Sequence, residues 1–378
     1  MSFCKSVNFT TFDLTLLGCL AFCLVLQLYY TLFVHLRLLR QAPVATPVAT
    51  KPLSVVICAR NEAPNLEKFL PAILTQDYPD YEVIVVNDRS WDGTGDLLEQ
   101  FAASEPRLRI VTIGENDKFR AGKKFAVTMG IKAARHEWLV FTDADCLPAS
   151  DQWLRHMQPP VNPQTEILLG YSPYLKKSGL LNALIRFETF FTAVNYLSFA
   201  LKGMPYMAVG RNMAYQKSLF FKSKGFAAHM HIPSGDDDLF VNANATKHNT
   251  KIRIEAAAHV WSEPKTTWLS YLRQKKRHVG AGRFYKKKHQ FILSTQIISQ
   301  LLFYVFLVAA ICLPATRYAA LGVLAVSLIV RCAIYPRLLS RLNCGGLRWW
   351  FPLLDPMLFL FLTFNGLIAI FIKKVQWK

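Results

Sequence analysis

Long apolar runs constrain this chain more than any other feature. Residues 14–36, 291–313 and 351–372 are each mostly apolar, over a length that can span about 30 Å of hydrocarbon as a helix. Residues 318–335 form a weaker fourth candidate, because Arg331 lies inside the run, near enough to its end for the side chain to reach the interface. One such run could be a buried core helix, but three in one chain predict an integral membrane protein.

The charges that flank these runs predict how the chain is oriented. Only Lys5 precedes the first run, whereas Arg37 and Arg40 follow it, which favours an uncleaved anchor over residues 1–40 instead of a signal peptide. Residues 273–288 hold eight Lys or Arg and no acid, directly before the second run. Because basic flanks stay on the cytoplasmic side, we expect an integral protein of the plasma (inner) membrane with its soluble part in the cytoplasm.

The carboxyl end leaves the number of spans open. Two or three membrane helices are predicted over residues 290–378. Four spans in all would place Lys373, Lys374 and Lys378 outside the cytoplasm, against the usual charge bias. The run that contains Arg331 is therefore expected to span, to be re-entrant or to lie at the interface.

Charge and cysteine usage exclude other classes of protein. The net charge of +19 would suit nucleic acid, but no nucleic-acid motif is visible and much of the charge lies beside the apolar runs. Attraction to anionic lipid head groups is the simpler interpretation. The eight cysteines show no C-x-x-C spacing, which disfavours a zinc site or a disulfide framework. We expect a membrane partner and no nucleic acid.

The stretch between the first two apolar runs alternates strand and helix patterns. A linker over residues 41–51, with Pro43 and Pro47, leads into a soluble domain over residues 52–289. Strands are predicted at 53–58, 82–86, 108–112 and 138–141, with helices between them at 66–74, 95–103 and 124–134. This alternation predicts an α/β domain with a mostly parallel, Rossmann-like sheet. Residues 180–201 predict an aromatic amphipathic helix, either on the membrane surface or packed on the sheet.

Two carboxylates, Asp143 and Asp145, follow the last of these strands. The carboxyl end of a buried strand is where open α/β sheets bind ligands. Carboxylates one residue apart can both turn toward one Mg²⁺ or Mn²⁺ ion, which prefers oxygen ligands and substrate phosphates. The alternative is a polar turn in which Asp145 caps a helix. Only the surrounding motifs can decide between the two.

Polar residues follow the other predicted strands at the same edge of the sheet. Arg60 and Glu62 come after the first strand, and Asp88 ends the second. A nucleotide would lie at this edge, where Asp88 could accept hydrogen bonds from a base or ribose. Lys123 follows Gly122 at a helix start, so ammonium and backbone N–H groups could face an anion. Each stretch alone could be a turn, a cap or a solvated helix start.

Two further patterns come later in the soluble domain. Gly235 precedes three consecutive aspartates, Asp236 to Asp238, and their mutual repulsion can raise a carboxylate pKa toward the working range of a base. Arg277 lies on a predicted helix after Trp268, and its planar fork suits phosphate oxygens. A plain acidic loop and a lipid-facing basic helix are the alternatives.

Taken in order, these features resemble membrane-bound family-2 glycosyltransferases of the inverting GT-A type, related to cellulose, chitin and hyaluronan synthases. The motifs are Val56-Ile57-Cys58-Ala59-Arg60-Asn61-Glu62, Val86-Asn87-Asp88-Arg89-Ser90 with Asp92-Gly93-Thr94, Gly122-Lys123-Lys124, Phe141-Thr142-Asp143-Ala144-Asp145, Gly210-Arg211-Asn212-Met213-Ala214-Tyr215, Gly235-Asp236-Asp237-Asp238-Leu239 and Gln274 to His278. Single motifs of this length are common, but seven in family order are specific. The resemblance covers residues 52–289.

The resemblance implies a GT-A fold and a nucleotide-diphosphate sugar as donor. It assigns nucleotide binding to Arg60, Glu62, Asp88, Lys123, Asp143 and Gln274. Asp143 and Asp145 match the D-x-D pair that holds Mg²⁺ or Mn²⁺, with Asp145 the direct ligand. The implied enzyme is a metal-dependent hexosyltransferase.

The resemblance also implies the catalytic and acceptor residues. Asp236 matches the general base when Leu239 is the anchor, and Asp237 is the alternative register. Arg277 matches the arginine that stabilises the leaving diphosphate. The acceptor side is assigned to Gly210, Asn212 and His278.

Two departures from the family pattern bear on the product. Gly235 stands where the family has a glutamate, and His278 stands where processive synthases have a tryptophan. We therefore expect transfer of a sugar to a hydroxyl of a lipid-linked or membrane-proximal glycan acceptor, of the kind used in cell envelope polysaccharide. The alternative is a processive synthase that couples polymerisation to export. A non-catalytic scaffold is disfavoured, because the metal, base and diphosphate positions are all filled.

Overall fold

The computed structural model describes residues 9–45, 48, 51–114, 122–160, 162–232, 234–278 and 281–371, without side chains at 276–278 and 365–371. Lys373, Lys374 and Lys378 of the predicted carboxyl-terminal tail lie outside the described residues.

Four parallel strands form one half of a seven-stranded sheet. They are β1 (Leu53–Ala59), β2 (Tyr81–Asp88), β3 (Leu108–Ile113) and β4 (Trp138–Asp143), in the spatial order β3-β2-β1-β4. Helices α3 (Ala63–Leu74), α4 (Thr94–Ser104) and α5 (Lys123–Ala133) connect them. All the strands and helices predicted from this part of the sequence are present, which confirms the βαβ alternation and the mostly parallel sheet.

The other half of the sheet is mixed. β7 (Met213–Gln216) runs antiparallel to β4, β6 (Ile167–Leu169) runs antiparallel to β7, and β8 (Thr250–Ile252) runs parallel to β6. β5 (Cys146–Pro148) leaves the end of β4 and pairs with β9 (Val260–Ser262) in a separate two-stranded sheet. The short helices are α6 (Trp153–Met157), α8 (Lys217–Lys222), α9 (Asp238–Asn244) and α10 (Trp268–His278).

Side chains of β1 alternate between two cores, as the period of a strand requires. Val55 and Ile57 pack with α3 on one face, and Val56 packs with α5 and α7 on the other. Helix α5 comes very close to the sheet, since a Cβ at its Gly130 would lie 2.6 Å from Val56. These contacts hold the carboxyl ends of β1, β2 and β4 at one rigid edge.

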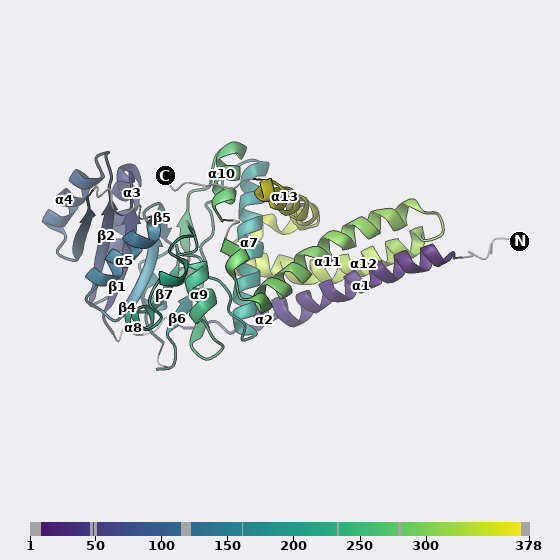
Figure 1. The fold of residues 1–378 in the computed structure, drawn as a ribbon, viewed down its shortest axis with the longest axis horizontal. Coiled ribbons are helices and arrows are strands. Elements are labelled where there is room, and N and C mark those ends of the chain that lie inside the picture. The colour runs from purple at the N-terminus through teal and green to yellow at the C-terminus, as the bar shows by residue number, and fades with distance from the viewer. Residues whose placement is uncertain are drawn as a thin grey trace, which may run out of the picture.

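Helix α7 (Leu180–Leu201) joins the sheet to a helical bundle. Phe187, Phe190 and Phe191 on it are buried in the core that also contains Phe141 of the sheet, and Figure 1 shows the helix between the two parts. The structure therefore favours the packed alternative for residues 180–201 over a helix on the membrane surface.

The bundle contains four helices long and apolar enough to cross a membrane, judged by length and composition among the described residues. They are Thr11–Arg40, Lys287–Cys312, Arg317–Arg341 and Gly345–Phe364. The first comprises α1 (Thr11–Tyr29), a π-helical segment (Tyr30–His35) and α2 (Leu36–Arg40), and the others contain α11 (Lys287–Cys312), α12 (Arg317–Arg341) and α13 (Phe351–Phe371). α1, α11 and α12 lie side by side and extend away from the sheet (Figure 1).

Arg331 does not reach toward an interface, which corrects the expectation for this residue. It is 4% exposed and forms an ion pair with Asp355 of α13. Its Nη1 donates to Gln300 of α11 at 2.7 Å, and Tyr304 donates to the same aspartate. The charge is thus neutralised inside the bundle, where it ties three helices together.

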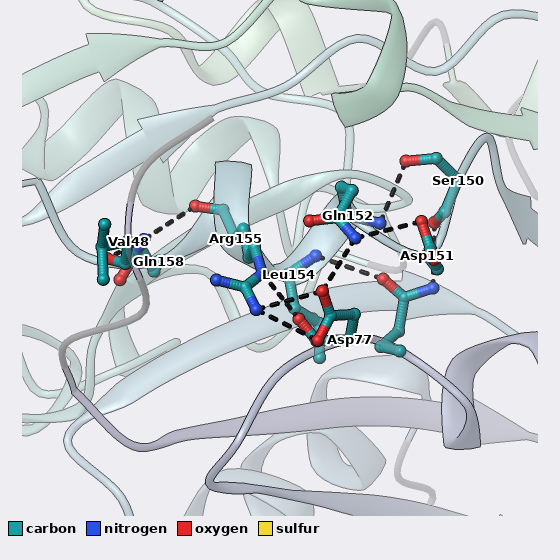
Figure 2. A network of polar contacts seen from close by, with 9 residues as sticks. Val48, Asp77, Ser150, Asp151, Gln152, Leu154, Arg155 and Gln158 are labelled. Atoms are coloured by element: carbon teal, nitrogen blue, oxygen red, sulfur yellow. Dashed lines mark hydrogen bonds and ion pairs between the residues drawn. The ribbon is translucent and has the colours of Figure 1, made fainter. Parts of the chain in front are cut away.

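A polar network fastens the amino-end edge of the sheet, opposite the edge where β1 and β4 end. Figure 2 shows Asp77, which follows α3. Its carboxylate accepts hydrogen bonds from Arg155 of α6 and from Gln152. Gln158 donates to the carbonyl of Val48 at 2.9 Å, which ties the linker to the domain. The network orients α6 at this edge of the sheet.

Candidate active site

The D-x-D pair lies at the end of β4, beside the end of β1. Asp143 is the last residue of β4 and pairs in register with Cys58 of β1. Asp145 occupies the turn into β5, and both aspartates are half-buried. Both carboxylates therefore stand at the edge where an α/β sheet binds its ligand.

Lys123 joins two of the predicted acidic positions. Its Nζ lies 2.8 Å from Asp143 Oδ1 and 3.5 Å from Asp236 Oδ2. Burial alone would lower the pKa of Lys123, but Asp143, Asp236 and Asp237 together raise it well above its ordinary value. A permanently charged ammonium thus sits between the D-x-D pair and the aspartate triplet. A cavity of about 20 Å³ is lined by Lys123, Asp143, Asp236 and Asp237, with room for a single water molecule.

The three consecutive aspartates have three different sets of contacts. Asp237 accepts hydrogen bonds from the N–H of Gly210 at 2.6 Å and of Asp238 at 2.8 Å. Asp238 accepts from the hydroxyl of Tyr285 at 2.9 Å. Burial, with the charge of Asp236, raises the pKa of Asp237 to about 6. Asp236 differs from both, because its contact among the described residues is the ion pair with Lys123.

The turn before the triplet depends on Gly235. Its φ is +86°, and a Cβ there would lie 2.7 Å from Leu239. A glutamate, the residue that the family resemblance would place here, does not fit this backbone. The departure noted in the sequence therefore has a local steric reason.

Close packing and buried hydrogen bonds hold the predicted acceptor loop in place. Gly210 approaches Asp237 so closely that an added Cβ would lie 3.1 Å from its carboxylate oxygen. The side chain of Asn212 is fully buried, accepts from Trp153 and donates to the carbonyls of Tyr171 and Ala258. Gly210 thus lines the cavity, whereas the amide of Asn212 holds the loop in place.

The nucleotide-side residues lie on two loops that brace each other. The N–H of Asn61 donates to Ser90, and the carbonyl oxygen of the Asn61 side chain accepts from the N–H of Trp91. Asn61 and Arg89 both have positive φ, 56° and 54°, a conformation that non-glycine residues adopt rarely and mostly at functional sites. The ends of β1 and β2 are thereby fixed as one wall.

The charged side chains on this wall are themselves held in place. Asp88 is 1% exposed and accepts from Arg89 Nε at 2.8 Å. Glu62 accepts from Asn65, and the guanidinium of Arg60 lies 5.5 Å from the ring centre of Trp91. The indole of Trp91 is exposed and the carboxylate of Asp88 is buried on the same wall.

Helix α10 brings the last predicted motif to the same region. Lys275 forms an ion pair with Glu188 of α7 at 2.5 Å, which docks the helix. Gln274 donates to the hydroxyl of Tyr174 at 3.1 Å. Arg277 and His278 belong to this helix, but their side chains lie outside the described residues, so their roles stay predictions.

The donor set suits a divalent metal held jointly with a substrate. Asp143 and Asp145 supply carboxylate oxygens from one turn. Among the described residues, no group of three or more His, Cys, Asp or Glu could hold an ion. Such a site leaves room for diphosphate oxygens and water, the ligands that Mg²⁺ or Mn²⁺ takes from a nucleotide. The two aspartates therefore fit Mg²⁺ or Mn²⁺ as two of its oxygen ligands.

Comparison with known proteins identifies the family. Residues 54–220 match the Glycosyl transferase family 2 profile, and residues 167–367, more than half of the chain, match Glycosyl transferase family group 2. The chain belongs to glycosyl transferase family 2. The predicted family is confirmed, and the D-x-D pair and the aspartate triplet lie within the matched residues.

Relatives with assigned names share only part of this glycosyltransferase. Glycosyltransferase AglE of Haloferax volcanii is 38% identical over 104 residues, 27% of this chain and 33% of that protein. Poly-beta-1,6-N-acetyl-D-glucosamine synthase of Staphylococcus epidermidis is 29% identical over 99 residues, 26% of this chain and 23% of that protein. The matched segment thus spans a third or less of either relative.

A solved structure covers nearly the whole glycosyltransferase. Mannosyltransferase PcManGT from Pyrobaculum calidifontis, in complex with GDP-Man and Mn²⁺, aligns with 89% of this chain and 99% of its own, with a TM-score of 0.59 and 20% identity. At this identity the likeness shows the fold, and it confirms the predicted GT-A class.

The sequence-based assignment missed one residue beside this site. Arg211 belongs to the predicted acceptor-loop motif, and its guanidinium lies 4.5 Å from the ring centre of Tyr174, the partner of Gln274. A basic residue inside a glycine–asparagine loop was the available signal.

Proposed function

We propose that this family-2 glycosyltransferase moves a sugar from a nucleotide-diphosphate sugar to a hydroxyl group of a lipid-linked or membrane-proximal glycan acceptor, with inversion at the anomeric carbon. The observation that carries the proposal is the placement of Asp236 and Asp143 on either side of Lys123. A base and a leaving-group site are thereby a few ångströms apart, as a direct displacement requires.

Asp236 is the general base of this proposal. Both carboxylate oxygens of Asp237 accept backbone hydrogen bonds, and Asp238 is engaged by Tyr285. Asp236 also lines the cavity, and of the three aspartates it is the one that forms an ion pair with Lys123 among the described residues. It takes the proton of the acceptor hydroxyl while that oxygen bonds to the anomeric carbon and the electron pair of the broken C–O bond leaves with the diphosphate.

The donor is bound by groups from several strand ends. Asp143 and Asp145 would hold Mg²⁺ or Mn²⁺, which would neutralise the diphosphate and act as a Lewis acid. Lys123, and Arg277 by resemblance, add fixed positive charge where negative charge grows. Arg60, Glu62, Asp88 and Gln274 complete the nucleotide side. The bound GDP-Man and Mn²⁺ of the Pyrobaculum mannosyltransferase support a donor and metal of these classes.

The acceptor side faces the helical bundle. α7 contacts both the sheet and the helices that are apolar enough to span a membrane. With Arg37, Arg40 and the basic residues of 273–288 on the cytoplasmic side, the site would lie in the cytoplasm against the inner surface of the plasma membrane. A lipid-linked acceptor could present its head group there, near Gly210 and His278.

A donor screen tests this function. The purified protein in detergent is incubated with GDP-mannose, UDP-N-acetylglucosamine and related donors, with Mn²⁺, Mg²⁺ or EDTA, and release of nucleoside diphosphate is measured. One donor should be turned over with metal and membrane lipid extract, and EDTA should abolish the turnover. No metal-dependent turnover or binding of any donor would reject the proposal in favour of a non-catalytic scaffold.

A processive synthase is the second candidate, supported by the poly-beta-1,6-N-acetyl-D-glucosamine synthase among the relatives. Its product would be a long polymer from the first minutes of reaction, whereas single addition gives one short product. Chromatography of labelled product at low conversion separates the two, and we expect the short product.

A further inference from the structure

Arg211 has a fixed backbone on both sides. The preceding residue, Gly210, is tied to Asp237, and the following residue, Asn212, is pinned by Trp153. The loop therefore cannot carry the arginine out to solvent without breaking buried hydrogen bonds. Its side chain is positioned by the fold.

The guanidinium rests on an aromatic ring and is incompletely satisfied. It lies 4.5 Å from the ring centre of Tyr174, and its Nη2 donates to the carbonyl of Ser172 at 3.3 Å. Its Nη1 is buried and has no hydrogen-bond partner among the described residues. None of the ion pairs formed within the described part of the chain includes Arg211.

The surroundings of Arg211 are those of the leaving-group site. Burial alone would lower its pKa, but Tyr174, Cys146 and the carboxylates of Asp145 and Asp143 raise it. The hydroxyl group of Tyr174 accepts a hydrogen bond from Gln274 of α10. The cation thus lies between the D-x-D turn and the helix that carries the Q-x-x-R motif.

A purely structural role does not account for this arrangement. A neutral side chain could pack on Tyr174, whereas a guanidinium N–H group that is buried without a hydrogen-bond partner costs free energy, because it has lost its hydration. A planar fork with a spare donor matches phosphate oxygens. The metal ligands beside it are the part of the site to which a phosphate would come.

We propose that Arg211, supported by Tyr174, binds a phosphate oxygen at this site. The phosphate belongs either to the diphosphate of the donor or to a phosphate-bearing acceptor. The inference rests on the proposed transferase function. It adds to that function a residue of the acceptor loop that recognises the negative charge of a substrate.

The test measures binding, so it does not depend on turnover. Calorimetry compares the wild type with Arg211→Gln for GDP or UDP in the presence of Mn²⁺, and for a short-chain isoprenyl phosphate against the matching isoprenyl alcohol. If the donor phosphate is the ligand, Arg211→Gln weakens nucleotide binding about tenfold to hundredfold, the range of a charge-assisted hydrogen bond. If the acceptor phosphate is the ligand, only the preference for isoprenyl phosphate over the alcohol is lost.

Three variants control the measurement. Arg211→Lys keeps the charge without the fork and should bind with intermediate affinity, and Tyr174→Leu should reproduce part of the Arg211→Gln loss. Lys177→Gln removes one charge from an exposed pair with Glu263 and should leave both affinities unchanged. Melting temperatures verify that each variant is folded.

Two outcomes would overturn the inference. If Arg211→Gln binds both kinds of phosphate ligand as the wild type does, the inference fails while the transferase function stands. If the wild type binds neither nucleotide nor isoprenyl phosphate, both fail together.

Discussion

Three adjacent aspartates in this chain have the same chemistry and three different tasks. Asp237 caps a helix and holds Gly210, Asp238 meets Tyr285, and Asp236 faces Lys123. The sequence alone left the base between Asp236 and Asp237. The contacts favour Asp236, because a base must have a carboxylate oxygen that is not already committed to the backbone.

Gly235→Ala tests whether the turn positions this base. A side chain at φ +86° is strained, and its Cβ would lie 2.7 Å from Leu239. We expect a loss of about 1–3 kcal/mol in the free energy of unfolding and a fall in turnover. Gly282→Ala is the control, since its Cβ meets nothing within 4 Å. Thermal melts that are equal for both variants would contradict the steric explanation.

His259 predicts a pH dependence of stability. It is fully buried, with Nε2 3.0 Å from the carbonyl oxygen of Ile254 and Nδ1 3.3 Å from Asn343 Nδ2, contacts that satisfy the neutral ring. Burial lowers its pKa to about 4, so below pH ~6.5 the unfolded chain binds a proton that the folded one refuses. Stability contributed by the neutral ring is full above pH ~6.5 and is lost toward pH 4, by about 3 kcal/mol.

The measurement is the melting temperature in detergent from pH 7.5 to 4.5. The wild type should lose more stability over this range than His259→Gln, which cannot titrate at this position. Parallel curves for the two proteins would show that His259 does not contribute the dependence.

At the residue scale, the sequence predicted which residues lie close together at the sheet edge, but not the contacts that each side chain makes. Asp143, Lys123 and Asp236 come together as expected, because strand ends and helix starts of a parallel sheet meet at one edge. The buried, fully bonded amide of Asn212 and the buried Nη1 of Arg211 were not predictable. Their contacts come from segments up to sixty residues away, which no local pattern encodes.

At the scale of elements, predictability follows strand length and periodicity. β1, β2 and β4 are long apolar runs between helices and were predicted. β6 and β8 have three residues each, too few to show an alternation. They join the sheet through β7, which runs antiparallel to β4. For helix 180–201 the pattern gave the bounds but left its packing open, since an apolar face fits lipid and core equally well.

The ion pair between α12 and α13 gives a prediction at this scale. Arg331 and Asp355 are 5% and 4% exposed in their side chains. Replacing one partner leaves a buried charge and should cost about 3–5 kcal/mol, whereas replacing both by apolar residues should be close to neutral. Arg331→Leu, Asp355→Leu and the double variant are compared by thermal unfolding in detergent. A double variant that is as unstable as the two single variants combined would contradict the pairing.

At the scale of the whole molecule, the sheet and the bundle share one core. Phe191 of α7 lies against Tyr335 and Phe359 of the bundle, and Phe187 lies against Phe351. The same core includes Phe141 of β4. The sheet edge that carries the candidate site and the helices apolar enough to cross a membrane are therefore packed as a single unit.

A chain cut to residues 52–289 should not behave as a free domain. It loses the partners of Phe187 and Phe191, and each aromatic side chain exposed again costs about 1.5–3 kcal/mol. We expect aggregation or a strongly lowered melting temperature relative to the full chain in detergent, measured by size-exclusion chromatography and thermal scans. A monomeric, equally stable and active fragment would show that the two parts are independent.

Asp236→Asn tests the central claim, a displacement with Asp236 as its base, most directly. Transfer of labelled sugar and binding of nucleoside diphosphate with Mn²⁺ are measured together in the purified full chain, with Asp238→Asn as the control for charge and folding. The proposed mechanism predicts a fall in turnover of at least about 100-fold, with nucleotide affinity little changed. Wild-type turnover in Asp236→Asn, or a loss confined to Asp237→Asn, would contradict it.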